Sequence, residues 1–368
     1  MMRIALIGPL PPPAGGMANQ TLQLAGLLRG EGLDVETVAV NAPYRPQWAG
    51  RVRGLRAAAR LLPYLAALWR SAGRVQLFHI MANSGWSWHL FSVPAIWIAR
   101  LRGVAVVVNY RGGEAGQFLQ RSRAAVAFSM RRAQALVVPS GFLQAVFGAS
   151  GMAAQVVPNI INLDRFSGAA QEGRQHGPHL LVARYLEPIY DNATAIRAYA
   201  LVRALHPAAT LTIAGSGQLR AELQALAAGL GVADGVSFTG QVDNSAMAAL
   251  YRRADVVLNC SLVDNMPNSV LEALASGVPV VSTNVGGVPY LVEHGRTALL
   301  VEPQAPRQMA DAVLQLAAEP GLRDSLRGAG LAMVQQFSWT QVRPRLLQVY
   351  QDALGRAGRP AAAPEHAA

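Results

Sequence analysis

The stretch DNMPNSVLEALASGVPVV, residues 264–281, carries the clearest structural signal in the chain. A polar loop leads into a helical pattern at 269–275, and an apolar run at 278–283 follows as a buried strand. A loop, a helix and a buried strand in succession form the repeating unit of a parallel α/β sheet.

The same alternation runs through the whole chain and predicts two doubly wound parallel sheets. In the first half the expected strands are 3–8, 34–40, 76–80, 104–109, 135–139 and 155–158. In the second half they are 179–184, 210–215, 236–240, 254–260, 278–283 and 298–301. Ligands of such sheets bind outside the carboxyl ends of the strands. The fold class is therefore predicted as α/β, with two Rossmann-like domains that face a cleft.

The composition of the connecting segments suggests the domain limits. We expect a first domain at 1–166, a polar linker at 167–178 and a second domain at 179–336. An amphipathic helical segment at 337–357 would pack back on the first domain, and the Ala/Pro-rich tail at 358–368 would be disordered.

Composition narrows the class of protein. With 368 residues, 52% hydrophobic and 14% charged, the chain has enough apolar material for two cores and does not resemble a disordered protein. A single cysteine, Cys260, excludes a disulfide framework. The first residues read as a strand rather than a signal peptide, and no apolar run is long enough to span a membrane. We therefore expect a cytoplasmic protein.

Positive charge is concentrated in the first half. All 32 basic residues are arginine, and 17 of them stand at or before Arg165, against 5 acidic residues. This asymmetry predicts a basic surface for an anionic partner. Nucleic acid is disfavoured, because aromatic stacking motifs and a recognition-helix module are missing. An anionic membrane surface fits better. Arg53, Arg56 and Arg60 would share one face of a helix, and Trp86 and Trp88, which suit a wet–apolar boundary, follow nearby. An ordinary solvated face would look the same.

Two carboxylates and three glycine pairs are the candidate binding groups. Asp264 in the loop and Glu272 in the helix could accept hydrogen bonds from sugar and ribose hydroxyls. The plainer alternative is that Asp264 only caps the helix and that Glu272 is a surface residue of the helix. Each glycine pair follows a strand, where backbone N–H groups can hold phosphate. Tight turns would need the same glycines, and the dinucleotide fingerprint G-x-G-x-x-G is absent. The pairs are Gly15-Gly16, Gly215 with Gly217, and Gly286-Gly287.

These motifs together resemble the family 4 retaining glycosyltransferases of the GT-B fold. The resemblance covers nearly the whole chain, and its most specific part is residues 264–281. It implies that the first domain binds the acceptor and the second binds a nucleotide-sugar donor. It also implies a reaction without a bound metal, and the sequence has neither a D-x-D motif nor a His/Cys cluster with ligand spacing. A lipid-linked or polysaccharide precursor at the inner membrane face would be the acceptor.

The resemblance also assigns roles to residues. Glu272 would bind the ribose, Asp264 would contact the donor sugar where the family usually has Glu, and Gly16 with Arg184 would hold the diphosphate. Asp264, Glu272 and Arg111 are the candidate catalytic residues. The candidate donor-binding residues are Gly15, Gly16, Arg184, Tyr190, Gly215, Gly217, Phe238, Asn265, Met266, Pro267, Asn268 and Glu272.

Two departures from the family pattern leave alternatives open. The family pairs an Arg with a Lys about five residues later, but this chain has no Lys, so Tyr190, another Arg or backbone amides must replace that charge. Arg111 stands near the place where many relatives have a His; it could supply charge to the donor phosphates or form a surface salt bridge with Glu114. A non-catalytic nucleotide-sugar-binding relative and another GT-B enzyme, such as an epimerase, remain alternatives.

Overall fold

The computed structural model describes residues 1–12, 15–44, 55–167 and 177–358, and it divides the chain into two compact units. The first unit contains Met1–Pro158 and the chain from Val342 onward; the second is Asn159–Gln341. The boundary thus falls at Pro158 rather than at residue 166. The short helix α6 (Leu163–Phe166) packs on α9 (Asn244–Arg253) and α10 (Asn268–Ala275) of the second unit, which explains the difference. Residues 168–176 and 359–368, to which the linker and tail predictions refer, lie outside the described residues.

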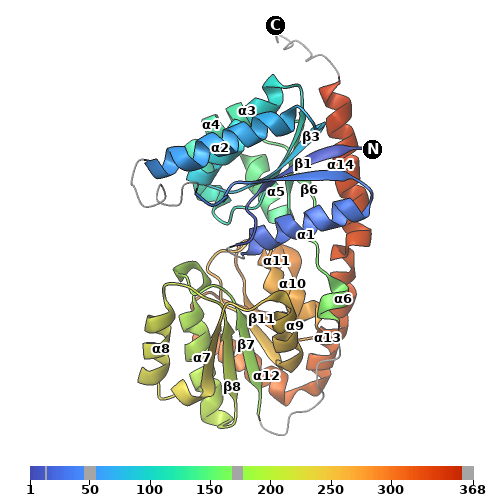
Figure 1. Cartoon of the computed structure of the whole chain (residues 1–368). Helices are drawn as coiled ribbons and strands as arrows, with labels where there is room; N and C mark the ends of the chain where they lie inside the picture. Colours follow the sequence, from blue (N-terminus) through green and yellow to red (C-terminus); the bar gives the residue numbers. More distant parts are fainter. Residues whose placement is uncertain (13–14, 45–54, 168–176, 359–368) are drawn as a thin grey trace. The chain divides into compact units, whose positions relative to one another are not determined.

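The first unit is built on a six-stranded sheet in the order β2-β1-β3-β4-β5-β6, in which every neighbouring pair is parallel (Figure 1). Its strands are β1 (Arg3–Gly8), β2 (Asp34–Ala39), β3 (Leu77–Ala82), β4 (Ala105–Tyr110), β5 (Ala135–Val138) and β6 (Gln155–Val156). Its helices are α1 (Gly16–Gly30), α2 (Leu55–Ala72), the π-helix η2 (Trp88–Ser92), α3 (Val93–Leu101), α4 (Ala115–Met130), α5 (Gly141–Ala149) and most of α14 (Trp339–Ala357).

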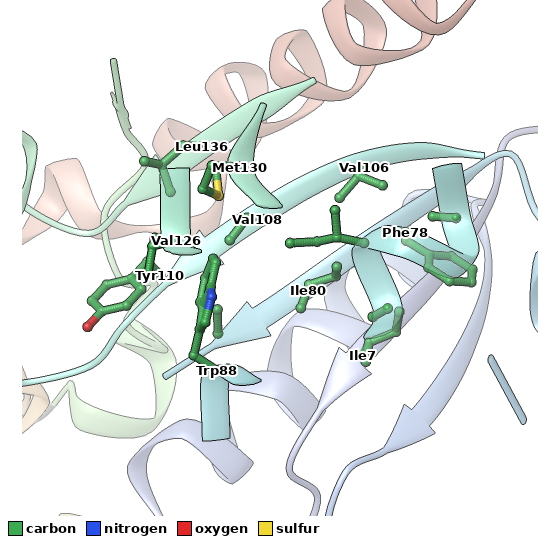
Figure 2. Packing of buried hydrophobic residues seen from close by; sticks show 14 of the residues in the cluster. Ile7, Phe78, Ile80, Trp88, Val106, Val108, Tyr110, Val126, Met130 and Leu136 are labelled. Atoms are coloured by element: carbon green, nitrogen blue, oxygen red, sulfur yellow. The ribbon is translucent and has the colours of Figure 1, made fainter. Parts of the chain in front are cut away.

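The two faces of this sheet differ in composition. Strand side chains alternate between faces, and on one face Phe78, Ile80, Val106 and Val108 pack with residues of α2, α3 and α4 in one apolar cluster (Figure 2). His79, between Phe78 and Ile80, points to the opposite face, where it contacts Tyr350 of α14. The C-terminal helix therefore packs on the first unit.

The second unit has a second six-stranded parallel sheet, in the order β12-β11-β10-β7-β8-β9. Its strands are β7 (His179–Ala183), β8 (Thr210–Ala214), β9 (Val236–Gly240), β10 (Val256–Asn259), β11 (Val280–Thr283) and β12 (Leu299–Val301). Its helices, besides α6, are η3 (Pro188–Tyr190), α7 (Asn192–Leu205), α8 (Arg220–Gly229), η4 (Ala233–Gly235), α9 (Asn244–Arg253), α10 (Asn268–Ala275), α11 (Val288–Leu291), α12 (Pro306–Ala318), α13 (Pro320–Val334) and η5 (Gln335–Phe337). The predicted α/β class with two parallel sheets is confirmed.

Only some residues of the basic and aromatic segment of the first unit lie at the surface. Trp88 is fully buried, so it does not belong to the expected basic–aromatic face. Arg60 is half-buried, and its guanidinium lies 4.3 Å from the centre of the Tyr44 ring. Trp86, in contrast, is 78% exposed. Arg53 and the side chain of Arg56, the other members of the expected basic face, lie outside the described residues. In the described part of the chain, none of the helices has the length and hydropathy to cross a membrane.

Candidate functional site

An ion pair forms at the carboxyl edge of the second sheet. Arg184 directly follows β7, and Asn259 ends the neighbouring strand β10. The Arg184 guanidinium donates from Nε to Asn259 Oδ1 at 2.9 Å and from Nη2 to Asp264 Oδ2 at 2.5 Å. Both charged side chains are only 12% exposed. The fold thus joins two predicted site residues that are eighty positions apart in the sequence.

A buried network holds this arginine in place. Asn259 donates from Nδ2 to Ser282 Oγ at 2.8 Å, and Ser261 Oγ donates to Asn259 Oδ1 at 3.0 Å. All three residues are buried, so their orientations are restricted. Within the described residues, Asn259 and Asp264 engage two of the five N–H donors of the guanidinium, and the fork still has donors for a bidentate anion.

Tyr190, one of the predicted replacements for the missing lysine, lies beside Arg184. The Arg184 guanidinium carbon lies 5.2 Å from the centre of the Tyr190 ring. The backbone N–H of Leu262 donates to the Ile189 carbonyl at 2.8 Å, which fixes η3 against the loop after β10. Burial raises the pKa of Tyr190, and Arg184 partly opposes this. Tyr190 therefore remains a neutral phenol that can donate a hydrogen bond beside the arginine.

The loop at 264–268 is held from two sides. A Cβ at Gly286 would lie 2.3 Å from the Asp264 carbonyl oxygen, and one at Gly287 would lie 1.8 Å from that of Asn265. On the other side, Asn159 Nδ2 donates to the Met266 carbonyl at 3.1 Å and to Asn268 Oδ1 at 2.7 Å. Glycine is therefore needed at 286 and 287 because any side chain there would prevent the close approach of this backbone to the loop at 264–268.

The Gly215–Gly217 loop has a similar structural reason. A Cβ at Gly215 would lie 2.0 Å from the Arg184 carbonyl oxygen, and one at Gly217 would lie 2.3 Å from that of Leu186. The loop is therefore packed on the backbone that carries Arg184, at the shared carboxyl edge of β7 and β8. Phe238, in the edge strand β9, is half-buried and packs against the core of the second unit.

Glu272 is a half-buried residue of α10 rather than a surface helix residue, so that alternative is wrong. Tyr251 of α9 donates its hydroxyl to Glu272 Oε2 at 2.9 Å. Burial raises the pKa of Glu272 to about 7, against the Tyr251 hydrogen bond and the charges of Arg184 and Arg165, which lower it. The carboxyl therefore changes charge near neutral pH. Asn265, Met266 and Pro267, just before α10, are buried.

The remaining predicted residues belong to the first unit. Gly15 caps α1 in an extended conformation, and a Cβ at Gly16, the first residue of the helix, would meet no atom within 4 Å. The glycine at position 16 is therefore not required by close packing of the described residues. Arg111 follows β4 and donates from Nε to Asn109 Oδ1 at 3.1 Å and from Nη1 to Gln20 Oε1 of α1. Burial lowers the pKa of Arg111 to about 10, so it remains a cation at neutral pH.

Several residues around these sites were not found from the sequence. Asn259 could have been noticed as a polar residue ending a fully buried strand. Asn159 stands three residues after β6, and its contact with a loop 107 positions away leaves no local signal. Tyr251 and Gln20 are ordinary helix residues in the sequence. Among the described residues, no group of three His, Cys, Asp or Glu side chains could hold a metal ion.

Comparison with known proteins accounts for both units. Residues 178–319 match the family model described as "Glycosyl transferases group 1", and residues 15–160 match that of a "Glycosyl transferase 4-like domain". The chain belongs to the group 1 glycosyltransferases. The family resemblance seen in the sequence is thereby confirmed, and the chain is an enzyme of that group.

Individual relatives of this glycosyltransferase differ in their substrates. It is 28% identical to the GDP-mannose-dependent alpha-(1-6)-phosphatidylinositol monomannoside mannosyltransferase of Mycobacterium tuberculosis, over 94% of this chain and 97% of the relative. It is 33% identical to the D-inositol 3-phosphate glycosyltransferase of Actinosynnema mirum, over 57% of this chain but only 54% of the relative. With several of the curated relatives it matches, the shared region spans about half of the relative's length or less.

Solved structures agree on the fold. The crystal structure of Anabaena Alr3699/HepE in complex with UDP and glucose has a TM-score of 0.74 and 17% identity, covering 95% of this chain and 100% of that one. Sucrose-phosphate synthase from Thermosynechococcus elongatus has a TM-score of 0.76 and 21% identity, covering 97% and 100%. The GT-B fold predicted from the sequence is confirmed.

Proposed function

We propose that this glycosyltransferase moves a sugar from a nucleotide-sugar donor to an acceptor with retention of the anomeric configuration, without a bound metal. The observation that carries the proposal is the Arg184–Asp264 pair, held at the carboxyl edge of the second sheet beside the loop at 264–268. Cation, carboxylate and helix N-terminus together suit a ligand that has both an anionic and a hydroxyl-rich part.

In this proposal each part of the donor has its own partner. The Arg184 fork and the Tyr190 hydroxyl bind the diphosphate, and Glu272 accepts hydrogen bonds from the ribose hydroxyls. Backbone N–H groups of the loop at 264–268 line the sugar pocket, apart from Pro267, which has none. The mannosyltransferase and the UDP complex named above are consistent with a nucleotide-sugar donor.

The transfer step needs stabilisation of the leaving group. The bond between sugar C1 and the phosphate oxygen breaks, and its electron pair leaves with the nucleoside diphosphate. The acceptor hydroxyl oxygen bonds to C1, and its proton goes to the leaving phosphate. Arg184 stabilises the charge that develops on the diphosphate, and Arg111 is the second candidate cation that the family resemblance implies.

A donor panel tests this proposal. The protein is incubated with UDP-, GDP- and ADP-sugars, and the release of nucleoside diphosphate is measured with and without simple glycosides as acceptors. We expect one donor to be hydrolysed slowly and transferred faster when an acceptor is present. Binding without turnover would favour the non-catalytic alternative, and conversion of the donor to an isomeric nucleotide-sugar would favour the epimerase.

We further propose that the acceptor is a lipid-linked or polysaccharide precursor of a bacterial cell-surface glycan, reached at an anionic membrane surface through the first unit. Large apolar side chains are exposed there: Leu62 and Trp69 of α2 are 66% and 48% exposed, close to Trp86 in the sequence. Arg102 lies 4.9 Å from the centre of the Trp69 ring. Arginine beside exposed tryptophan suits the boundary between anionic headgroups and acyl chains.

Vesicle co-sedimentation tests the membrane part. Binding should require anionic lipid and decrease with added salt, because the arginine contribution is screened. Leu62→Ser should weaken binding, whereas Leu205→Ser, which changes a leucine of the second unit that is 68% exposed, should not. Equal binding to neutral vesicles would refute the electrostatic contribution.

A further inference from the structure

Two polar side chains stand inside strands that are otherwise apolar. His79 of β3 is 0% exposed and Asn109 of β4 is 1% exposed, and all other residues of these neighbouring strands are buried as well. A buried polar group is costly unless its hydrogen bonds are made. The role proposed above for Arg111 toward the diphosphate does not by itself explain why a histidine is buried at position 79.

These residues form a continuous chain of hydrogen bonds in the first unit. Arg111 Nε lies 3.1 Å from Asn109 Oδ1, and Asn109 Nδ2 lies 3.0 Å from His79 Nε2. His79 Nδ1 lies 2.7 Å from the Tyr350 hydroxyl oxygen, on α14. The chain therefore begins at Arg111, passes through two strands and ends on the C-terminal helix.

The direction of each bond follows from its chemistry. Arg111 can only donate, so the Asn109 oxygen must face it and the Asn109 amide group must face His79. His79 Nε2 then accepts, which places the imidazole proton on Nδ1, from where it is donated to Tyr350. Burial and the charge of Arg111 lower the pKa of His79 to about 3, so the ring stays neutral and its tautomer is the only variable.

We propose that Tyr350 is a positioning residue for Arg111, acting through the tautomer of His79 and the orientation of the Asn109 amide. The inference rests on the proposed function, in which Arg111 is a candidate cation for the diphosphate of the nucleotide-sugar. With the Tyr350 oxygen as acceptor, the Nδ1–H tautomer is favoured and Asn109 turns its oxygen to Arg111. The C-terminal helix, far away in the sequence, is thereby part of the first unit's site.

The proposal makes a specific statement about Tyr350→Phe. Without the hydroxyl, the buried proton on Nδ1 loses its acceptor, so the preference for the Nδ1–H tautomer is weakened and Nε2–H becomes populated. In that tautomer Asn109 turns its oxygen toward His79 and its amide hydrogens toward Arg111. Two donors then face each other, and Arg111 keeps Gln20 but loses the Asn109 contact.

Imidazole ¹⁵N NMR on full-length protein with labelled histidine tests the tautomer directly. The chain has seven histidines, and His79→Gln assigns the signal. We expect the proton of His79 on Nδ1 in the wild type and a shift toward Nε2 in Tyr350→Phe. A proton on Nε2 in the wild type, or no change in the variant, would overturn the proposal. This result does not depend on activity, so it is separate from any failure of the proposed function.

A double-mutant cycle tests the coupling to Arg111. Tyr350→Phe should lower the transfer rate roughly tenfold in the wild type and have no further effect in Arg111→Ala. The control is Tyr64→Phe, which removes another buried hydroxyl of the first unit, one that donates to the Phe91 carbonyl at 2.8 Å. This control should leave the rate unchanged. Additive losses, or an equal loss in the control, would mean that Tyr350 contributes only to stability.

Discussion

Two arginines at the carboxyl edges of two similar sheets are held in different ways. Arg184 of the second unit is paired with the Asp264 carboxylate, whereas Arg111 of the first unit is held by the amide oxygens of Asn109 and Gln20. A carboxylate cancels charge as it orients the guanidinium, while an amide orients it without cancelling its charge. We infer that the donor diphosphate competes with Asp264 for Arg184.

The largest effect is expected from Arg184→Ala. The substitution removes the proposed cation of the diphosphate site and leaves the nearly buried Asp264 carboxylate without its partner. We expect the affinity for the product nucleoside diphosphate to fall about a hundredfold, because a charge-assisted bond contributes roughly 1.5–3 kcal/mol and anionic Asp264 then repels the ligand. Calorimetric titration measures this.

Arg203→Ala is the matched control for that substitution. Arg203 forms an ion pair with Asp234 in the same unit, but the Asp234 side chain is 73% exposed. Affinity should change little, since an exposed ion pair contributes little to stability and nothing to a separate site. Equal affinities for the Arg184→Ala protein and the control would place the diphosphate elsewhere.

Substitutions of Glu272 should have the next largest effect, and their effect on affinity should depend on pH. Glu272→Ala should lower the transfer rate roughly ten- to a hundredfold through loss of the ribose contact. In the wild type, donor hydroxyls favour the carboxylate form, so affinity for the intact nucleotide-sugar should rise with pH up to about 7 and then level off. Glu272→Gln should bind more weakly without this pH dependence; a slope that persists in the variant would assign it to another group.

The pH dependence of the free energy of unfolding gives a second test of the raised pKa of Glu272. Its pKa in the folded state, about 7, is above the ordinary 4.5, so its contribution to stability is complete below pH 4.5 and is lost as the pH rises toward 7. The free energy of unfolding of Glu272→Gln relative to the wild type should therefore increase from pH 4.5 to pH 8, by on the order of 3 kcal/mol. Urea unfolding of both proteins at the two pH values measures it, and a constant difference would contradict the assigned burial.

Asp264→Asn should give the smallest effect on binding, and it sharpens the comparison of the two arginines. The amide keeps a hydrogen bond to Arg184 but no longer cancels its charge, so Arg184 comes to resemble Arg111. We expect the nucleoside diphosphate to bind a few-fold more tightly, while transfer slows because the sugar contact is weakened. Weaker nucleoside diphosphate binding would show that Asp264 helps to bind the product rather than competing with it.

The positions of the repeating strands could be predicted from the sequence, but the structural roles of single residues mostly could not. Buried parallel strands give near-continuous apolar runs, so all twelve strands of the two sheets were expected close to their positions. The Gly286-Gly287 and Gly215–Gly217 loops were correctly placed after strands, but only coordinates show that their missing Cβ atoms allow close backbone contacts. The Arg184–Asp264 pair and the Arg111–Tyr350 chain join distant segments, and no local pattern encodes such contacts.

The central claim is that the carboxyl edge of the second sheet binds the donor through Arg184 and Glu272. A crystal structure with the nucleoside diphosphate of the donor selected by the panel tests it most directly. We predict diphosphate oxygens within hydrogen-bond distance of the Arg184 guanidinium and both ribose hydroxyls on the Glu272 carboxylate. A nucleotide bound with its diphosphate away from Arg184 and its ribose away from Glu272 would contradict the account.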